Sequence, residues 1–413
     1  MSDLLPGGRP AIEPVPPDVP PPPFPAQPLV PIVDLSHRPP DRQPDWSIIP
    51  DWLSARVAAT VACTDADLLP RVEGAGDVIE RDGERLQVMH NGVLVTEGGY
   101  YGVLSSEIIR CLRGVHEPQE EVAYDAILRR LATTSPAHRA PVMVELGAYW
   151  AYYALWFLDS FPDGHAICLE PDPRNMAVGE HNFTLNGRSG TFLHAAIGDG
   201  SGATMPFHPD DGAPPIDLPT HDLRSLLGLL DEPAIDVLLA DIQGGEHPLL
   251  AHSLDVLRSG KIRFVVVSTH DLSLTGSAMT HQHVLALLVE AGAHIICEHS
   301  VTESVSGDGV VVASFDPRDR DLVVEVTHGR ACLSLSGEWE PRLEDYRARL
   351  QDTRRRLDDT SAELAEVRAQ LSAAEEHLAR LRRALPLRIR RAVLRRLPSR
   401  GRRGRRGPRV SES

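Results

Sequence analysis

The chain has 413 residues, 42% of them hydrophobic, with 35 prolines and a formal net charge of −16. This length exceeds that of a typical single domain, so we expect one sizeable core extended by proline-rich or charged segments that do not fold into it. The five cysteines are odd in number and far apart, which excludes a disulfide framework or a CxxC zinc site and favours a reducing, cytoplasmic location. We expect neither a secretory signal nor a membrane span, because no apolar run approaches the roughly 20 residues that a span requires.

The N-terminal part is predicted to hold a tether followed by an accessory segment. Residues 1–45 contain fifteen of the prolines and should be disordered, serving as a tether or as a ligand for an aromatic groove. Residues 46–116 should form an accessory segment, in which Trp46 and Trp52 indicate an amphipathic helix. The dipeptide Asn91-Gly92 predicts a β-hairpin with a type I′ turn.

Residues 117–316 show buried apolar strands alternating with helices. Strands are expected at residues 142–146, 165–170, 190–197, 235–241, 262–268, 293–299 and 309–314, with helices at 106–112, 117–131, 150–160, 173–186, 246–259 and 281–291. This alternation predicts an α/β fold with a parallel, doubly wound, Rossmann-like sheet, ending in an antiparallel hairpin at one edge.

A heptad pattern follows the linker expected at residues 317–340. Leucine recurs every seventh residue at positions 343, 350, 357, 364, 371, 378 and 385. The repeat predicts a coiled coil over residues 341–385 and self-association through it. A lone solvated helix is the alternative, because Thr353 and Thr360 weaken the middle of the apolar seam.

The C-terminal residues 386–413 form an arginine-rich tail. Residues 382–409 contain thirteen arginines and no acidic residue, although the chain as a whole is acidic. We expect this tail to attach the protein to an anionic membrane surface, with a merely solvated tail as the alternative. Nucleic acid is disfavoured as a partner, because no aromatic residue is interleaved to stack on bases.

Acidic residues and glycines gather where the predicted strands end, which is where ligands bind in a doubly wound sheet. Glu145 and Gly147 end the first strand, and the glycine permits close backbone approach at the start of the next helix. Glu170 and Asp172 end the second strand, where an acid accepts hydrogen bonds from a ribose diol. These four residues are therefore candidates for binding a nucleoside cofactor.

Asp241, Glu246 and His270 follow the ends of two further strands, so we expect them near the reacting centre. His270 is the candidate general base, because imidazole titrates near neutral pH, and a hydrogen-bonded structural role is its alternative. The three side chains have ligand types that suit a divalent ion. Because they lack tight ligand spacing in the sequence, we expect no metal.

The sequence resembles the FkbM family of methyltransferases over residues 117–314. The segments that carry the resemblance are Val-Glu-Leu-Gly-Ala at 144–148, Leu-Glu-Pro-Asp-Pro-Arg-Asn at 169–175, residues 182–187, Ala-Ala-Ile-Gly-Asp at 195–199, and Ala-Asp-Ile-Gln-Gly-Gly-Glu at 240–246. The resemblance implies a seven-stranded class I methyltransferase sheet and S-adenosylmethionine as cofactor. It also implies site roles: Glu145 and Gly147 at the methionine end, Glu170 at the ribose, Ala196 at the adenine, and Asp241 with Glu246 near the donor methyl or the acceptor. The turn Gly147-Ala148-Tyr149-Trp150-Ala151 departs from the family's usual Gly-Ala-Asn-x-Gly.

The function expected from these features is O-methylation of a small-molecule or glycan acceptor. The family's use of sugar hydroxyls favours a glycan or glycoconjugate, made in polysaccharide biosynthesis at the inner face of the membrane. A nicotinamide-dependent oxidoreductase is one alternative, opposed by the lack of a GxGxxG motif after the first strand. A degenerate methyltransferase fold acting as a coiled-coil scaffold is another, favoured by the altered turn at 147–151 and opposed by the intact segment 240–246.

Overall fold

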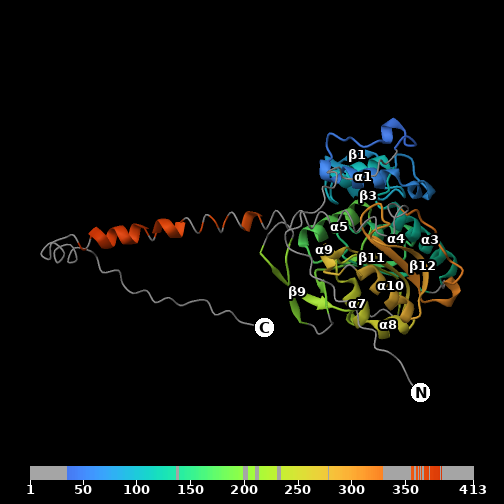
Figure 1. The fold of residues 1–413 in the computed structure, drawn as a ribbon. Helices are drawn as coiled ribbons and strands as arrows, with labels where there is room; N and C mark the ends of the chain where they lie inside the picture. The colour runs from blue at the N-terminus through green and yellow to red at the C-terminus, as the bar shows by residue number, and fades with distance from the viewer. Residues whose placement is uncertain are drawn as a thin grey trace, which may run out of the picture. The chain divides into compact units, whose positions relative to one another are not determined.

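The structure is a computed structural model that describes residues 35–135, 139–198, 203–209, 214–229, 234–277 and 279–328, and scattered helical residues between 355 and 383. The chain divides into two compact units, Met1–Glu338 and Trp339–Ser413 (Figure 1). The arginine-rich tail, residues 329–340 of the predicted linker and most of the predicted tether lie outside the described residues.

A seven-stranded sheet forms the centre of the first unit. Its strands are β4 (Val142–Leu146), β5 (His165–Leu169), β6 (Thr191–Leu193), β10 (Ile235–Ala240), β11 (Ile262–Thr269), β12 (His294–His299) and β13 (Gly309–Ser314). They lie in the order β12-β13-β11-β10-β4-β5-β6. The five strands from β11 to β6 are parallel, and β13 pairs antiparallel with both β11 and β12. The predicted doubly wound sheet with an antiparallel edge, the class I methyltransferase arrangement, is confirmed.

Helices cover both faces of this sheet because successive strand side chains point to opposite sides. The core on one face contains Met143 and side chains of α3 (Pro118–Thr134), α4 (Tyr152–Ser160) and α5 (Pro173–Leu185). The core on the other contains Val142, Val144 and side chains of α6 (Leu223–Leu229), α7 (Glu246–His252), α8 (Leu254–Arg258) and α10 (Thr280–Glu290) (Figure 1). The helix predicted at residues 246–259 is thus two helices, α7 and α8, which meet at Ser253.

One predicted strand contributes to two different sheets. Of residues 190–197, β6 pairs with β5, whereas β7 (Ala196–Ile197) pairs with β9 (Ile216–His221). Strand β9 also pairs antiparallel with β8 (Thr204–Phe207), which completes a small three-stranded sheet. The sequence did not predict β8 and β9, because neither contains an apolar run: β8 is largely exposed, and β9 mixes exposed and buried residues.

The N-terminal segment packs on the same core as the sheet. It comprises η1 (Pro40–Arg42), α1 (Asp51–Ala62), η2 (Thr64–Leu68), the antiparallel strands β1 (Val78–Arg81), β2 (Glu84–Val88) and β3 (Leu94–Thr96), and α2 (Val103–Cys111). Strand β3 is joined to α5, since backbone N–H groups of Leu94 and Thr96 donate to the side-chain oxygens of Asn186 and Asn182 at 2.9 and 3.0 Å. This segment therefore shares its core with α3 and α4.

The predicted hairpin exists between β2 and β3, but its turn is not type I′. That turn type needs positive φ at both central residues. Gly92 has a φ of +94°, whereas Asn91 has no positive φ and instead accepts a hydrogen bond on Oδ1 from the Val93 N–H at 3.1 Å. This side-chain hydrogen bond stabilises the turn without the left-handed conformation that was expected at Asn91.

The remaining elements of the first unit are α9 (Leu272–Thr275) and η3 (Pro317–Asp319).

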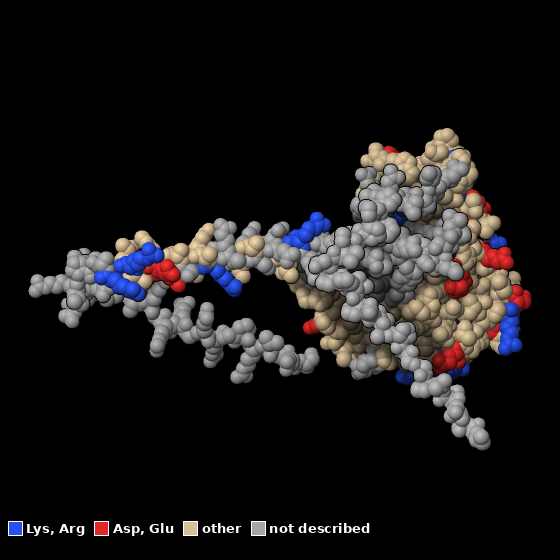
Figure 2. Space-filling view, viewed as in Figure 1, with Lys and Arg blue, Asp and Glu red and all other residues tan. Residues whose placement is uncertain are grey.

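The described residues of the second unit are helical and carry both basic and acidic side chains (Figure 2). Four leucines of the heptad repeat are 50–64% exposed there: Leu357, Leu364, Leu371 and Leu378. An exposed apolar seam is what a coiled-coil helix shows in a single chain. Self-association stays a prediction. Of the helices that the structure describes, none combines the length and apolar content needed to span a membrane.

Candidate active site

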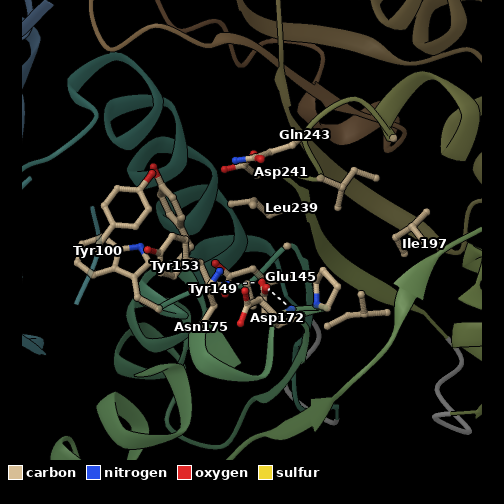
Figure 3. A pocket seen from close by; sticks show the side chains of 18 of the residues that line it. Tyr100, Glu145, Tyr149, Tyr153, Asp172, Asn175, Ile197, Leu239, Asp241 and Gln243 are labelled. Carbon is tan, nitrogen blue, oxygen red and sulfur yellow. Dashed lines mark hydrogen bonds between the residues drawn. The ribbon is translucent and has the colours of Figure 1, made fainter. Parts of the chain in front are cut away.

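A cavity of about 780 Å³ lies beyond the carboxyl ends of β4, β5 and β10. Its lining includes every residue that the sequence analysis assigned to cofactor binding: Glu145, Gly147, Glu170, Asp172, Ala196 and Asp241. Figure 3 shows Asp241 and Gln243 together on one side of the cavity, with Glu145 and Tyr149 across from them in this view. The sheet therefore gathers these separate strand ends into one site, as parallel strands do.

The turn after β4 is as tight as a cofactor-binding turn requires, despite its unusual sequence. Gly147 has a φ of +77°, and a Cβ at this position would lie 1.8 Å from the carbonyl oxygen of Asp241. Tyr149 and Ala151 also adopt left-handed conformations, with φ of 44° and 56°. Such conformations cost non-glycine residues roughly 1–3 kcal/mol and collect at functional sites. The turn at residues 147–151 thus keeps a tight backbone conformation, although Tyr149 and Ala151 are strained in it.

Glu170 has the place and the chemistry expected of a ribose-binding acid. Its two carboxylate oxygens accept the backbone N–H groups of Tyr149 and Asp172, both at 2.9 Å, and the side chain is 4% exposed. Burial raises its pKa to about 7, against the opposing hydrogen bonds. A carboxylate offers about four acceptor positions, so capacity remains for a diol.

Asp172 is committed to its own helix, although it lines the same cavity. Its Oδ1 accepts the Arg174 N–H at 2.9 Å, which caps α5, and its Oδ2 pairs with the Arg174 guanidinium at 2.6 Å. These contacts lower its pKa, with the hydrogen bond from the Arg174 side chain as the largest cause. Glu170 is accordingly the stronger candidate for the ribose.

The cavity lining holds two kinds of group that suit S-adenosylmethionine. Glu145 accepts the Ala154 N–H at 3.0 Å, and burial raises its pKa to about 8. A carboxyl group that stays protonated at neutral pH can donate a hydrogen bond to the methionine carboxylate. Ala196 lines the same cavity as three apolar side chains that suit an adenine: Ile197, Met205 and Phe207.

Asp241, His270 and Glu246 form a chain of close contacts at the ends of β10 and β11, with a hydrogen bond between His270 and Glu246. His270 Nε2 lies 3.1 Å from Asp241 Oδ1, and His270 Nδ1 lies 2.9 Å from Glu246 Oε1. Burial disfavours charge on the imidazole, but the hydrogen bonds to Asp241 and Glu246 outweigh it and raise the pKa of His270 to about 11. His270 is therefore an imidazolium at neutral pH.

Glu246 lies behind His270 rather than beside the reacting centre, where the sequence analysis expected it. It is fully buried, does not line the cavity, and accepts the backbone N–H groups of Ile242 and Gly244 at 3.1 and 3.0 Å. Its carboxylate fixes the imidazole from the far side. We treat it as a positioning residue.

The same three side chains offer metal-ligand atoms within 4.8 Å of one another. However, each ring nitrogen of His270 already faces a carboxylate, Asp241 on one side and Glu246 on the other. An ion bound at either nitrogen would have to replace one of these two contacts. The imidazole thus lies between two carboxylates, an order that suits proton transfer or positioning better than coordination of one ion. That the site works without a metal stays a prediction, and retention of activity in a chelator would test it.

Sequence reasoning missed the part of the lining that comes from residues 100–120. This part consists of Tyr100, Tyr101, His116, Glu117 and Glu120. Tyr100 stacks on Trp150, with ring centroids 4.6 Å apart and an interplanar angle of 12°. The sequence did contain a signal for this part of the lining. Glu117, Glu120 and Glu121 share one face of a helix, and acids on a face that packs toward a core, which is normally apolar, indicate a polar site.

Comparison with known proteins identifies the central part of the chain. Residues 137–295 match the profile of the methyltransferase FkbM domain. No curated protein matches the chain.

Several solved structures match part of this chain at low identity. A precorrin-6y C5,15-methyltransferase from Geobacter metallireducens is 17% identical, with 47% of this chain and 88% of that one covered and a TM-score of 0.29. A putative O-methyltransferase from Klebsiella pneumoniae is 18% identical, with 46% and 89% covered and a TM-score of 0.28. The bifunctional kinase-methyltransferase WbdD is 13% identical, with 46% of this chain but only 37% of that chain covered and a TM-score of 0.30. Similarity this low does not identify an acceptor.

Proposed function

Because residues 137–295 form a methyltransferase FkbM domain, with S-adenosylmethionine as the methyl donor, we propose that the protein is an O-methyltransferase acting on a sugar hydroxyl of a glycan or glycoconjugate. The observation that best supports a hydroxyl acceptor is the Asp241–His270–Glu246 chain, in which His270 and Glu246 are buried and the outer carboxylate of Asp241 lines the cofactor cavity. A hydroxyl must lose its proton during methylation, so a proton acceptor at this place suits an oxygen nucleophile.

The proposed mechanism assigns the proton to Asp241. The bound donor supplies a methyl group already activated on a sulfonium. Asp241 accepts the acceptor's proton, and burial makes it more basic by raising its pKa against the opposing hydrogen bond from His270. His270 holds the carboxylate in place, and Glu246 holds His270. This differs from the base role expected for His270, because an imidazolium has no free nitrogen to accept a proton.

The first prediction tests these roles by substitution. Asp241→Asn should lower kcat by about 10²–10⁴-fold while leaving the Kd for S-adenosylhomocysteine within a few-fold of the wild type. The same measurements on Asp255→Asn, which replaces an exposed aspartate, provide the control. Loss of cofactor binding equal to the loss of turnover would make Asp241 a structural residue instead.

The pH dependence of kcat separates the two candidate bases. With Asp241 as base, activity falls as pH decreases through its raised pKa and is flat above that pKa. With His270 as base, activity would keep rising until the pH approached about 11. A rise of that kind would return the base role to His270.

The acceptor proposal and its cellular setting have their own test. Cell-envelope glycans from a strain lacking the gene should be lighter by one or more methyl groups than those from the parent strain. We propose a cytoplasmic enzyme of polysaccharide biosynthesis at the inner face of the membrane, since the arginine-rich tail suits an anionic surface. Failure to bind S-adenosylhomocysteine would favour the alternative of a degenerate scaffold.

A further inference from the structure

A second cavity, of about 560 Å³, adjoins the first. The two cavities share six lining residues: Tyr100, Tyr101, His116, Glu117, Asp241 and Gln243. Asp241 lines both cavities, whereas His270 lines only the second, and the residues that suit an adenine line only the first. A molecule in the second cavity would therefore meet Asp241 without contacting the residues that suit the adenine.

The outer wall of this second cavity comes from the N-terminal segment and is largely apolar. It consists of Ile48, Pro50, Leu53 and Val57 from the region of α1, and Val103, Leu104 and Ile108 from α2. Leu274 adds another apolar side chain from α9. The wall thus offers apolar surface to a ligand, while the polar groups gather near Asp241.

This wall is fixed to the rest of the site. The Thr60 hydroxyl donates to the carbonyl oxygen of Val305 at 2.7 Å, and Arg56 lies 3.9 Å from Asp308. Gly307 packs so closely that a Cβ there would lie 2.6 Å from the Arg56 guanidinium carbon. The cavity is therefore built by contacts between α1 and the loop before β13.

Charge near the reacting end disfavours an anionic ligand. Three carboxylates line this cavity, on Glu117, Asp241 and Asp308. Burial, with repulsion from Asp241, raises the pKa of Asp308 to about 6, although His270 opposes the rise. The described lining also carries three cationic side chains, on Arg56, His116 and His270. Each already faces carboxylates: Arg56 faces Asp308, His116 faces Glu117 and Glu121, and His270 faces Asp241 and Glu246. A phosphate or carboxylate would have to compete with these carboxylates for a cation.

From these features we infer that the second cavity binds the methyl acceptor and selects an uncharged hydroxyl compound with an apolar portion. The hydroxyl end lies at Asp241 and the apolar portion lies along α1 and α2. This inference rests on the proposed function, because it uses Asp241 as the group beside which methyl transfer occurs. It adds a selectivity that the proposed function does not imply: uncharged amphipathic glycosides fit the second cavity, and sugar phosphates do not.

The test compares three sugar probes in a methyl-transfer assay: n-octyl β-D-glucoside below its micelle concentration, glucose, and glucose 6-phosphate. The octyl glucoside should have a KM at least about tenfold below that of glucose, because each buried methylene contributes about fourfold in affinity. Glucose 6-phosphate should be the poorest acceptor. Equal KM values for glucose and the octyl glucoside, or a preference for the phosphate, would overturn the inference while leaving a sugar methyltransferase.

A matched pair of variants ties the selectivity to the cavity. Val103 lies on the wall and is 60% exposed, and Val289 lies on α10 outside both cavities and is 55% exposed. Val103→Glu should raise the KM for octyl glucoside at least about tenfold and leave the Kd for S-adenosylhomocysteine unchanged, whereas Val289→Glu should change neither. Equal effects of the two substitutions would contradict the assignment.

Two further readouts separate failure of this inference from failure of the proposed function. Methylation of 1-octanol but of none of the three sugar probes, with sensitivity to Val103→Glu, would support the cavity assignment and overturn the proposal of a glycan acceptor. If no probe is methylated, calorimetric binding of octyl glucoside in the presence of S-adenosylhomocysteine decides. Binding that Val103→Glu abolishes supports the inference, and absence of binding to the wild type overturns it.

Discussion

Glu170 and Asp172 show how two neighbouring acidic residues can differ in the contacts available to a ligand, because Asp172 caps a helix and Glu170 does not. Both Glu170 and Asp172 follow β5 and line the cofactor cavity. Asp172 has an arginine two residues later that occupies its carboxylate, whereas Glu170 accepts only N–H groups and retains acceptor capacity. Sequence position alone made them equal candidates, and the hydrogen bonds distinguish them.

We predict that Glu170→Ala weakens binding of S-adenosylhomocysteine by about 1–3 kcal/mol, because a buried diol loses its acceptor. Isothermal calorimetry measures the change directly. Asp172→Ala, the control, removes the N-cap and should lower the stability of α5 more than it lowers cofactor affinity. If both substitutions weakened binding equally, Glu170 would have no special role at the ribose.

At the scale of an element, α3 begins in an unusual way. Acidic residues in a first turn are normally exposed and favoured by the helix dipole. Here Glu121 is fully buried, and its carboxylate lies 2.6 Å from His116 Nδ1 and 3.3 Å from His90 Nε2. Burial raises the pKa of Glu121, but His116 more than offsets this and lowers it to about 2. The start of α3 is therefore held by buried charge pairs beside the active site.

This arrangement predicts that stability decreases at alkaline pH. Burial disfavours the charged form of His116, but Glu121 and Glu117 outweigh it and raise its pKa from 6.5 to about 10. A raised histidine pKa gives stability that is fully present below pH 6.5 and is lost as pH rises through about 10. Between these values the free energy of unfolding should fall by up to about 1.4 kcal/mol per pH unit from this group.

Urea unfolding from pH 6 to pH 10 would measure that slope. His116→Gln should flatten it, leaving the part due to His270, whose pKa is raised as well. His283→Gln, at an exposed position on α10, should leave the slope as in the wild type. Parallel pH profiles for the wild type and His116→Gln would show that folding does not raise the pKa of this histidine.

On the scale of the whole molecule, the second unit has a surface that one chain leaves uncovered. The described heptad leucines are at least 50% exposed, so a partner helix would bury them. We predict that the full chain forms a parallel oligomer that presents its arginine-rich tails together. Adjacent tails would strengthen a membrane attraction of about 1 kcal/mol per arginine through effective concentration.

Two lengths of the protein test this prediction. Light scattering should give an oligomer for the full chain and a smaller species for a chain ending at Gly337. Only the full chain should sediment with anionic vesicles, and raised salt should release it. A chain ending at Leu385 should remain oligomeric but lose the vesicles. If the chain ending at Gly337 kept both properties, the coiled coil and the tail would have neither role.

The sequence by itself determined the central sheet and where its ligand-binding edge lies. Strands β4 and β13 match their predicted bounds, because a buried strand is an apolar run bounded by polar residues or glycine. Since parallel strands end at one edge, the acids and glycines after β4, β5 and β10 could be assigned to a common site before their contacts were known.

Only the tertiary structure decided how these groups act. The pKa of His270 depends on Asp241 and Glu246, which precede it by 29 and 24 residues, and the acceptor cavity depends on α1 meeting the loop before β13. Residues 190–197 divide between two sheets because Ala196 and Ile197 find a partner in β9. Periodicity in a sequence records that a segment is buried, whereas protonation, cavity shape and strand pairing depend on which distant segment buries it.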